Sequence, residues 1–211
     1  MATTSIVRRP FRYVYFNATL YIIAANILFF ALSYAMPSLK AYMALNPAAV
    51  LSGYLWQPIT YMFAHADIMH LLVNMLGLFF FGTQVERAMG SKEFLLFYFL
   101  TGILAGLASF AIFVATGAWY TALLGASGAI FAVLLAFAIV DPEAMIYLYG
   151  IVPIRAPVMV LGYAGIEIAS QLFSFQSSVA HLTHLAGFVW AWLYFLIRFG
   201  VNPAKRLFRR R

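Results

Sequence analysis

Four residues of this chain have the types and the spacing that acyl transfer requires. Ser127 supplies a hydroxyl, and His184 supplies a base that can take the hydroxyl proton. His70 and Asn74 lie four residues apart, so on one helix they share a face and present two hydrogen-bond donors. Donors held in place can stabilise the oxyanion that forms when a serine attacks a carbonyl. Together these residue types predict hydrolysis through a serine nucleophile.

Each of these residues also has a simpler structural explanation. His70 and Asn74 are typical of hydrogen bonds between helices, and His184 taken alone is typical of a histidine that holds a helix in place by hydrogen bonding. Ser127, in Gly125-Ala126-Ser127-Gly128, is typical of a helix N-cap or of small-residue packing. The pattern also resembles the nucleophile elbow of soluble hydrolases, but the strand that this fold needs is missing. Only the combination of the residues favours catalysis over structure.

Two questions about the base stay open at this point. His181 and His184 are both on the last apolar segment, and Gly187 follows His184 by three residues, on the same helix face. A glycine there allows close packing beside His184, which favours His184 over His181 as the base. Glu167 is the only carboxylate within the predicted spans, and nothing in the sequence places it near His184. We therefore predict a Ser–His dyad without an acid.

The composition decides where these residues must act. Of 211 residues, 65% are hydrophobic and 9% are charged, against about 25% charged in soluble domains. This excludes a soluble globule, a disordered chain and a nucleic-acid module, and the basic residues lie at segment ends rather than in a patch. The chain has no cysteine, which excludes disulfides, thiolate catalysis and cysteine metal sites. The sequence predicts an integral membrane protein.

Stretches with few or no charges mark the membrane-spanning helices. We expect six of them: 16–36, 68–85, two within 94–140, 156–173 and 179–197. The second helix within 94–140 begins at the motif that contains Ser127. The expected fold is thus an all-α, six-helix membrane bundle over residues 13–200, preceded by a cytoplasmic segment, 1–12, and followed by a basic cytoplasmic tail, 201–211.

Basic residues orient this bundle, because they are enriched on the cytoplasmic side. With both termini cytoplasmic, twelve of the thirteen basic residues face the cytoplasm and only Lys40 faces the other side. A cleaved signal peptide at the N-terminus is less consistent, because its removal would place the C-terminal arginines outside. The long loop 37–66 then lies on the non-cytoplasmic side, and its length predicts a structured, functional segment.

Three motifs in register give the chain a family resemblance. His65, His70 and Asn74 fit the pattern HxxxxHxxxN, residues 125–128 fit GxSG, and His184 with Gly187 fits HxxG. In order, spacing and helix assignment the sequence resembles the rhomboid intramembrane serine proteases over roughly residues 10–200. The six-helix form with both termini inside is also the basic form of this family.

The resemblance implies a role for each motif residue. Ser127 would be the nucleophile and His184 its general base, while His70, Asn74 and the backbone N–H of Ser127 would form the oxyanion hole. Supporting positions would be Gly125, Gly128 and Gly187. The loop that contains Trp56 would be embedded in the membrane, and the helix over 156–173 would be a lateral gate for substrate.

The sequence departs from the family pattern at three positions. Gln57 follows Trp56 where arginine is frequent, Thr183 precedes His184 where alanine is common, and Ala191 stands where a glycine is often found. These departures concern the stability of the loop and the packing of the helices more than the chemistry.

The expected function is hydrolysis of transmembrane segments of single-span or multi-span membrane proteins within the lipid bilayer. No metal, cofactor or nucleic acid is expected, and the expected location is a bacterial inner membrane. One alternative is a catalytically inactive, rhomboid-like binder of transmembrane helices. Another is a proton-coupled transporter that uses His70, His184 and Glu167 as a relay, but the first and third predicted helices offer almost no polar path for it.

Overall fold

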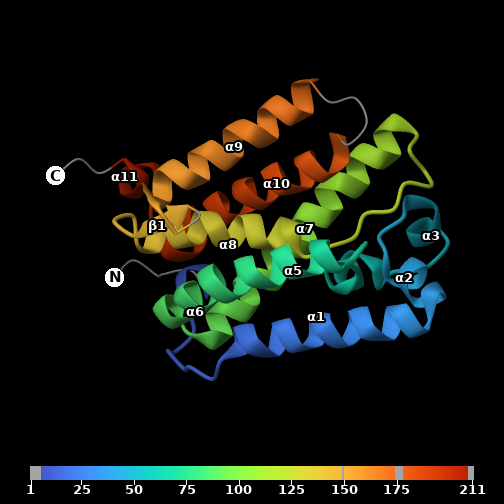
Figure 1. Ribbon diagram of the computed structural model, residues 1–211, viewed down its shortest axis with the longest axis horizontal. Helices are drawn as coiled ribbons and strands as arrows, with labels where there is room; N and C mark the ends of the chain where they lie inside the picture. The colour runs from blue at the N-terminus through green and yellow to red at the C-terminus, as the bar shows by residue number, and fades with distance from the viewer. Residues whose placement is uncertain (1–5, 149, 174–177, 209–211) are drawn as a thin grey trace.

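The computed structural model describes residues 6–148, 150–173 and 178–208, and these form a bundle of helices (Figure 1). Helix α8 (Ser127–Val140) lies inside the bundle, packed against α7 (Ser91–Thr116), α9 (Ala156–Phe173) and α10 (Ser178–Tyr194). After Ser127 the sequence of α8 is apolar on every side, which is typical of a helix buried all round. The candidate nucleophile therefore lies at the start of the most enclosed helix.

The remaining predicted spans are also helical along the described residues. The first is α1 (Ala18–Ala35). The second begins as α5 (Ile68–Gly77), continues through the π-helical η3 (Leu78–Gly82) and ends with α6 (Thr83–Met89). The last passes from α10 into the π-helical η4 (Phe195–Phe199).

Length and apolarity support an integral membrane protein. Within the described part of the chain, four helical segments are long and apolar enough to cross a bilayer: Ala18–Ala35, Ile68–Met89, Ser91–Thr116 and His181–Phe199. Helix α8 has 14 residues, so at 1.5 Å per residue it is about 21 Å long, shorter than the roughly 30 Å hydrocarbon core. Six spans with both termini in the cytoplasm stay a prediction.

The described segments nearest to the chain ends lie at the same end of the bundle. The 3₁₀ turn η1 (Ile6–Arg8) contacts η4, and α11 (Pro203–Leu207) contacts α8 (Figure 1). Glu93 of α7 joins the N-terminal segment to η4, because its carboxylate accepts hydrogen bonds from Phe11 N at 2.9 Å and from Arg198 Nε at 2.7 Å. A buried charge paired in this way fixes the N-terminal segment against η4.

A second buried carboxylate holds the start of α1. Glu86 is fully buried and accepts hydrogen bonds from the backbone N–H groups of Ala18 (2.6 Å) and Thr19 (2.9 Å). It also accepts bonds from the hydroxyls of Thr19 and Ser91. The first N–H groups of a helix lack partners within the helix, so a carboxylate from another helix acts here as the N-terminal cap.

The loop 37–66 is structured, as its length predicted. It contains the short helices α2 (Pro37–Met43), α3 (Pro47–Leu51) and α4 (Gln57–Thr60) and the 3₁₀ turn η2 (Tyr61–Phe63).

The position that departs from the family pattern in this loop is well satisfied. Gln57 is fully buried, donates to the carbonyl of Tyr42 at 3.3 Å and accepts from Asn46 N at 3.0 Å. The indole of Trp56 donates to the same carbonyl at 3.0 Å. The neutral glutamine thus holds two parts of the loop together without a buried charge.

The prediction of an all-α chain is wrong between α8 and α9. Strands β1 (Met145–Leu148) and β2 (Val152–Arg155) pair antiparallel, with Met145 opposite Arg155. Gly150 has a φ of +72° in the turn, which glycine adopts without strain. We predicted only a break between spans here, because four-residue strands carry too little periodicity to identify.

Candidate active site

Ser127 and His184 are adjacent although 57 residues separate them in the chain. The Nε2 atom of His184 lies 2.8 Å from the Oγ atom of Ser127. Ser127 is the first residue of α8, and His184 lies in the first half of α10. This is the hydrogen bond that a serine nucleophile needs with its base.

Small residues let the two helices approach closely enough to form this bond. A Cβ atom on Gly187 would overlap the carbonyl oxygen of Gly128, so the two backbones touch at this point. A Cβ atom on Gly128 would lie 3.0 Å from the Thr183 methyl and 3.1 Å from Ala105. Close approach through small residues is a common way for membrane helices to pack. The crossing of α8 and α10 therefore sets the distance between Ser127 and His184.

Thr183, the second departure from the family pattern, is accommodated at the same crossing. Its side chain is buried, and its hydroxyl shares a hydrogen bond with that of Ser109 on α7 at 2.5 Å.

The imidazole ring of His184 is fixed from two further sides. The ring of Phe131 stacks on it with a centroid distance of 4.1 Å and an interplanar angle of 4°. On its other nitrogen, Nδ1, the ring meets Oε1 of Glu167 at 3.0 Å. A donor bond from Nδ1–H to a carboxylate leaves the lone pair on Nε2, which is the tautomer that can accept a proton from Ser127.

The contact with Glu167 corrects the prediction of a dyad without a nearby acid. Glu167 lies on α9, which packs against α10, the helix that carries His184. The sequence did not indicate which side of α9 faces α10, because that depends on the packing of the two helices. The three residues Ser127, His184 and Glu167 form a continuous chain of hydrogen-bonding groups.

His181, the competing candidate base, contacts the other oxygen of the same carboxylate. Its Nδ1 atom lies 2.5 Å from Oε2 of Glu167. Its ring stands edge-on to that of His184, with centroids 6.4 Å apart. The geometry therefore brings His184 to Ser127 and His181 to Glu167.

The candidate oxyanion residues are brought together only in part. Gly125 has a φ of +116°, and a Cβ atom there would lie 2.7 Å from Nε2 and Cε1 of His70. The edge of the His70 ring thus faces the turn that leads into Ser127. The amide of Asn74 donates to the backbone carbonyl of His70 at 2.7 Å, within α5. This bond occupies one of its two amide hydrogens.

The loop 37–66 positions the turn before Ser127. Leu45 and Leu123 exchange backbone hydrogen bonds of 2.9 Å in each direction. The N–H of Gly125 donates to the carbonyl of Tyr61 at 2.9 Å, and the hydroxyl of Tyr61 donates to Gly102 O at 2.6 Å. The nucleophile is therefore fixed by the loop on one side and by α10 on the other.

Two residues of the site were missed by sequence reasoning. Phe131 follows Ser127 by four residues, so the helical spacing of α8 could have placed it on the same face as the nucleophile. Glu167 had a weaker signal, because an acidic residue within an apolar helix usually marks function, but its partner could not be derived.

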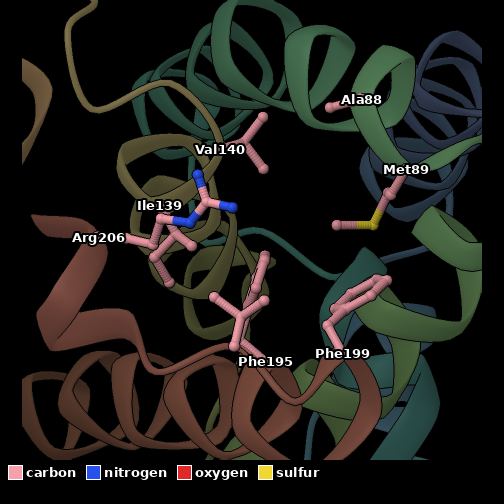
Figure 2. A pocket seen from close by; sticks show the side chains of 8 residues that line it. Ala88, Met89, Ile139, Val140, Phe195, Phe199 and Arg206 are labelled. Atoms are coloured by element: carbon pink, nitrogen blue, oxygen red, sulfur yellow. The ribbon is translucent and has the colours of Figure 1, made fainter. Parts of the chain in front are cut away.

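A separate cavity lies at the other end of α8. It has a volume of about 300 Å³ and is lined by residues of α6, α8 and η4 and by Val201 and Arg206 (Figure 2). Ile139 and Val140, at the end of α8, form part of its wall. It lies about 18 Å along the helix from Ser127, and its described lining holds no serine or histidine, so it is not the site of acyl transfer.

Comparisons of the sequence with known proteins point to one family. The model of the Rhomboid domain matches residues 52–201. RHOMBOID-like protein 12, mitochondrial, of Arabidopsis thaliana is 36% identical over 64% of this chain and 44% of its own length. Presenilin-associated rhomboid-like protein, mitochondrial, of Homo sapiens is 31% identical over 80% of this chain and 48% of its own length. Rhomboid protease GluP of Bacillus subtilis is 39% identical over 44% of this chain and 17% of its own length.

These relatives also bear on location and on extent. The two that match the largest shares of the chain are named as mitochondrial proteins, which conflicts with the expected bacterial inner membrane. The chain spans about half the length of these curated relatives. The domain match covers most of the sequence and includes the three motifs together with Glu167, and from this we conclude that the chain belongs to the rhomboid family.

Proposed function

We propose that this protein is an intramembrane serine endopeptidase that cleaves transmembrane segments of other membrane proteins. The observation that carries the proposal is the 2.8 Å contact between Ser127 Oγ and His184 Nε2 at the start of a buried helix. The family includes serine intramembrane proteases, of which one matched relative, GluP, is named a protease.

In the first step the oxygen of Ser127 bonds to the carbonyl carbon of the substrate, and its proton passes to Nε2 of His184. Glu167 accepts the hydrogen bond from Nδ1–H of His184 and stabilises the imidazolium that forms, so it acts as a positioning residue. The proposed site therefore has three residues, where the sequence predicted a dyad. The Phe131 ring keeps the imidazole plane fixed during the transfer.

The carbonyl electrons move to the oxygen, which becomes an oxyanion. The N–H of Ser127, in the first turn of α8, and the side chains of His70 and Asn74 are the proposed donors. Asn74 keeps one amide hydrogen beyond its bond to His70, and this hydrogen is the one we assign to the oxyanion.

Collapse of the oxyanion breaks the C–N bond, and the amine leaves with the proton from His184 Nε2. Water then attacks the acyl-enzyme and gives its proton to His184, and Ser127 leaves with that proton restored. A substrate helix must unwind before the attack, because its carbonyls are otherwise held in internal hydrogen bonds. We place the entry route beside α9, as the family resemblance implies.

A fluorophosphonate probe tests this proposal, because it reacts covalently with a base-activated serine. The purified protein in detergent should label, and Ser127→Ala and His184→Ala should each abolish the labelling. His181→Ala should still label. A folded parent that does not label would contradict the proposal and would favour the inactive helix binder.

A further inference from the structure

The carboxylate of Glu167 and two histidines form a cluster of possible metal ligands. One carboxylate oxygen of Glu167 and one ring nitrogen from each of His181 and His184 all lie within 4.8 Å of one another, and the Nδ1 atoms of both histidines contact the carboxylate. The two histidines are three residues apart on α10, so both project toward α9, which carries Glu167. Three ligand atoms from two packed helices thus converge on one point.

The chemistry of this donor set is specific. Two imidazole nitrogens and one carboxylate oxygen form the ligand set of several zinc enzymes, in which each ligand atom lies about 2.0–2.2 Å from the ion. Tetrahedral ligands at that distance are roughly 3.4 Å apart. The widest separation in the cluster, at most 4.8 Å, therefore needs to contract by at most about 1.4 Å. Hard cations such as Mg²⁺ prefer oxygen ligands, so the two nitrogens select a transition metal.

The cluster is accessible and has ligand capacity left. The side chains of His181 and His184 are 21% and 17% exposed, and that of Glu167 is 9% exposed. An ionised carboxylate can accept about four hydrogen bonds, and Glu167 accepts two from described residues. An ion can therefore reach the cluster and keep one position for water.

We infer that Glu167, His181 and His184 bind Zn²⁺, and that the bound ion switches off Ser127. The binding of Zn²⁺ is independent of the proposed protease function, whereas the inhibition of Ser127 rests on that function. The sequence led us to expect no metal, because only the packing of α9 against α10 brings these three residues together.

The inhibition follows from the tautomer of His184. Without metal, Nδ1 carries the hydrogen and donates it to Glu167, while the lone pair of Nε2 faces Ser127. Zinc needs the lone pair of Nδ1, so the ring hydrogen must move to Nε2. In this form Nε2–H donates to Ser127 Oγ and has no lone pair to accept the hydroxyl proton. No net proton is gained or lost by the ring, and the base is blocked.

Direct titration tests the site on the full chain, purified in detergent without a histidine tag. Calorimetry with zinc chloride should show one Zn²⁺ per chain. The His181→Ala and Glu167→Gln variants should each bind at least tenfold more weakly. Glu143→Gln, an exposed carboxylate elsewhere on the surface, is the matched control and should bind as the parent does. Equal affinity in the parent and the two cluster variants would overturn the site.

The labelling rate tests the inhibition separately. For each protein, the rate of fluorophosphonate labelling with zinc is divided by its own rate without zinc. For the parent this ratio should fall at least tenfold near saturation with zinc and recover when a chelator is added. His181→Ala should need at least tenfold more zinc than the parent for the same decrease in the ratio. A ratio of one at saturating zinc would overturn the inhibition. If the parent does not label at all, the proposed function fails, and the titration still decides the metal site.

Discussion

Replacement of Glu167 by glutamine distinguishes a three-residue site from a Ser–His dyad. The glutamine side chain keeps the shape of the glutamate but loses its charge and one acceptor oxygen. It also brings an amide NH₂ group that can face Nδ1 of His184. If the NH₂ group faces Nδ1, the ring must accept there and carry its hydrogen on Nε2, which prevents it from taking the proton of Ser127.

The charge alone gives the size of the effect. When Ser127 transfers its proton, the imidazolium and the carboxylate have charge centres about 4 Å apart, which corresponds to about 4 kcal/mol at an effective dielectric constant of 20. A loss of that size slows the chemical step roughly a thousandfold. The side chains are 17% and 9% exposed, so water screens part of this interaction. We expect a decrease in kcat of roughly 30- to 1000-fold, with KM little changed.

The assay is cleavage of a transmembrane reporter substrate in detergent, with kcat and KM measured separately. Glu143→Gln makes the same chemical change at an exposed carboxylate that pairs with Arg155 of the β-hairpin, and it controls for general effects of the substitution. Thermal unfolding of each variant shows whether the protein is folded during the assay. Parent-like kcat in folded Glu167→Gln would refute the role of Glu167 and restore the dyad.

Three further predictions concern stability. Gly187→Ala places a methyl group against the carbonyl of Gly128, so it should lower the free energy of unfolding by about 1–3 kcal/mol and slow the labelling of Ser127. Gly162→Ala, where a Cβ atom would meet open space, is the control and should do neither. Glu86→Gln removes a charge that accepts four hydrogen bonds, so a loss of about 2–4 kcal/mol is expected in thermal unfolding, and a change below 0.5 kcal/mol would contradict the capping role. Burial lowers the pKa of His65 to about 4, so the unfolded chain takes up a proton more readily than the folded chain. The contribution of neutral His65 to the free energy of unfolding is complete above about pH 6.5. It is lost as the pH falls toward 4, by up to about 3 kcal/mol. Unfolding of His65→Leu should vary less over this range, and an equal slope in both proteins would exclude His65 as the cause.

The elements that carry the site could be predicted because their signals are local. Charges end the apolar stretches, and Gly125 and Gly128 mark the start of the helix that carries Ser127. The hairpin was missed because each strand has only four residues. The internal carboxylates Glu86 and Glu93 could not be assigned most of their partners, because all of their donors except the Ser91 hydroxyl lie 67 to 105 residues away.

Glu167 shows why the central detail of the site could not be derived. A single acid in an apolar helix must face protein rather than lipid, and this much follows from its cost in hydrocarbon. Which partner it meets depends on the rotation of α9 about its axis and on the crossing of α9 with α10. Both are set by packing between segments, which one sequence does not encode in any spacing.

The three carboxylates buried in the bundle nevertheless differ in a way that separates structure from chemistry. Glu86 and Glu93 each accept four hydrogen bonds from described residues, so their lone pairs are saturated and they can only hold helices together. Glu167 accepts two, and both come from imidazoles. A buried charge with so few donors is costly to keep for stability alone. The same shortage leaves it free to stabilise a transient imidazolium or to bind a metal ion, and for this reason we assign to Glu167, rather than to Glu86 or Glu93, a part in the function.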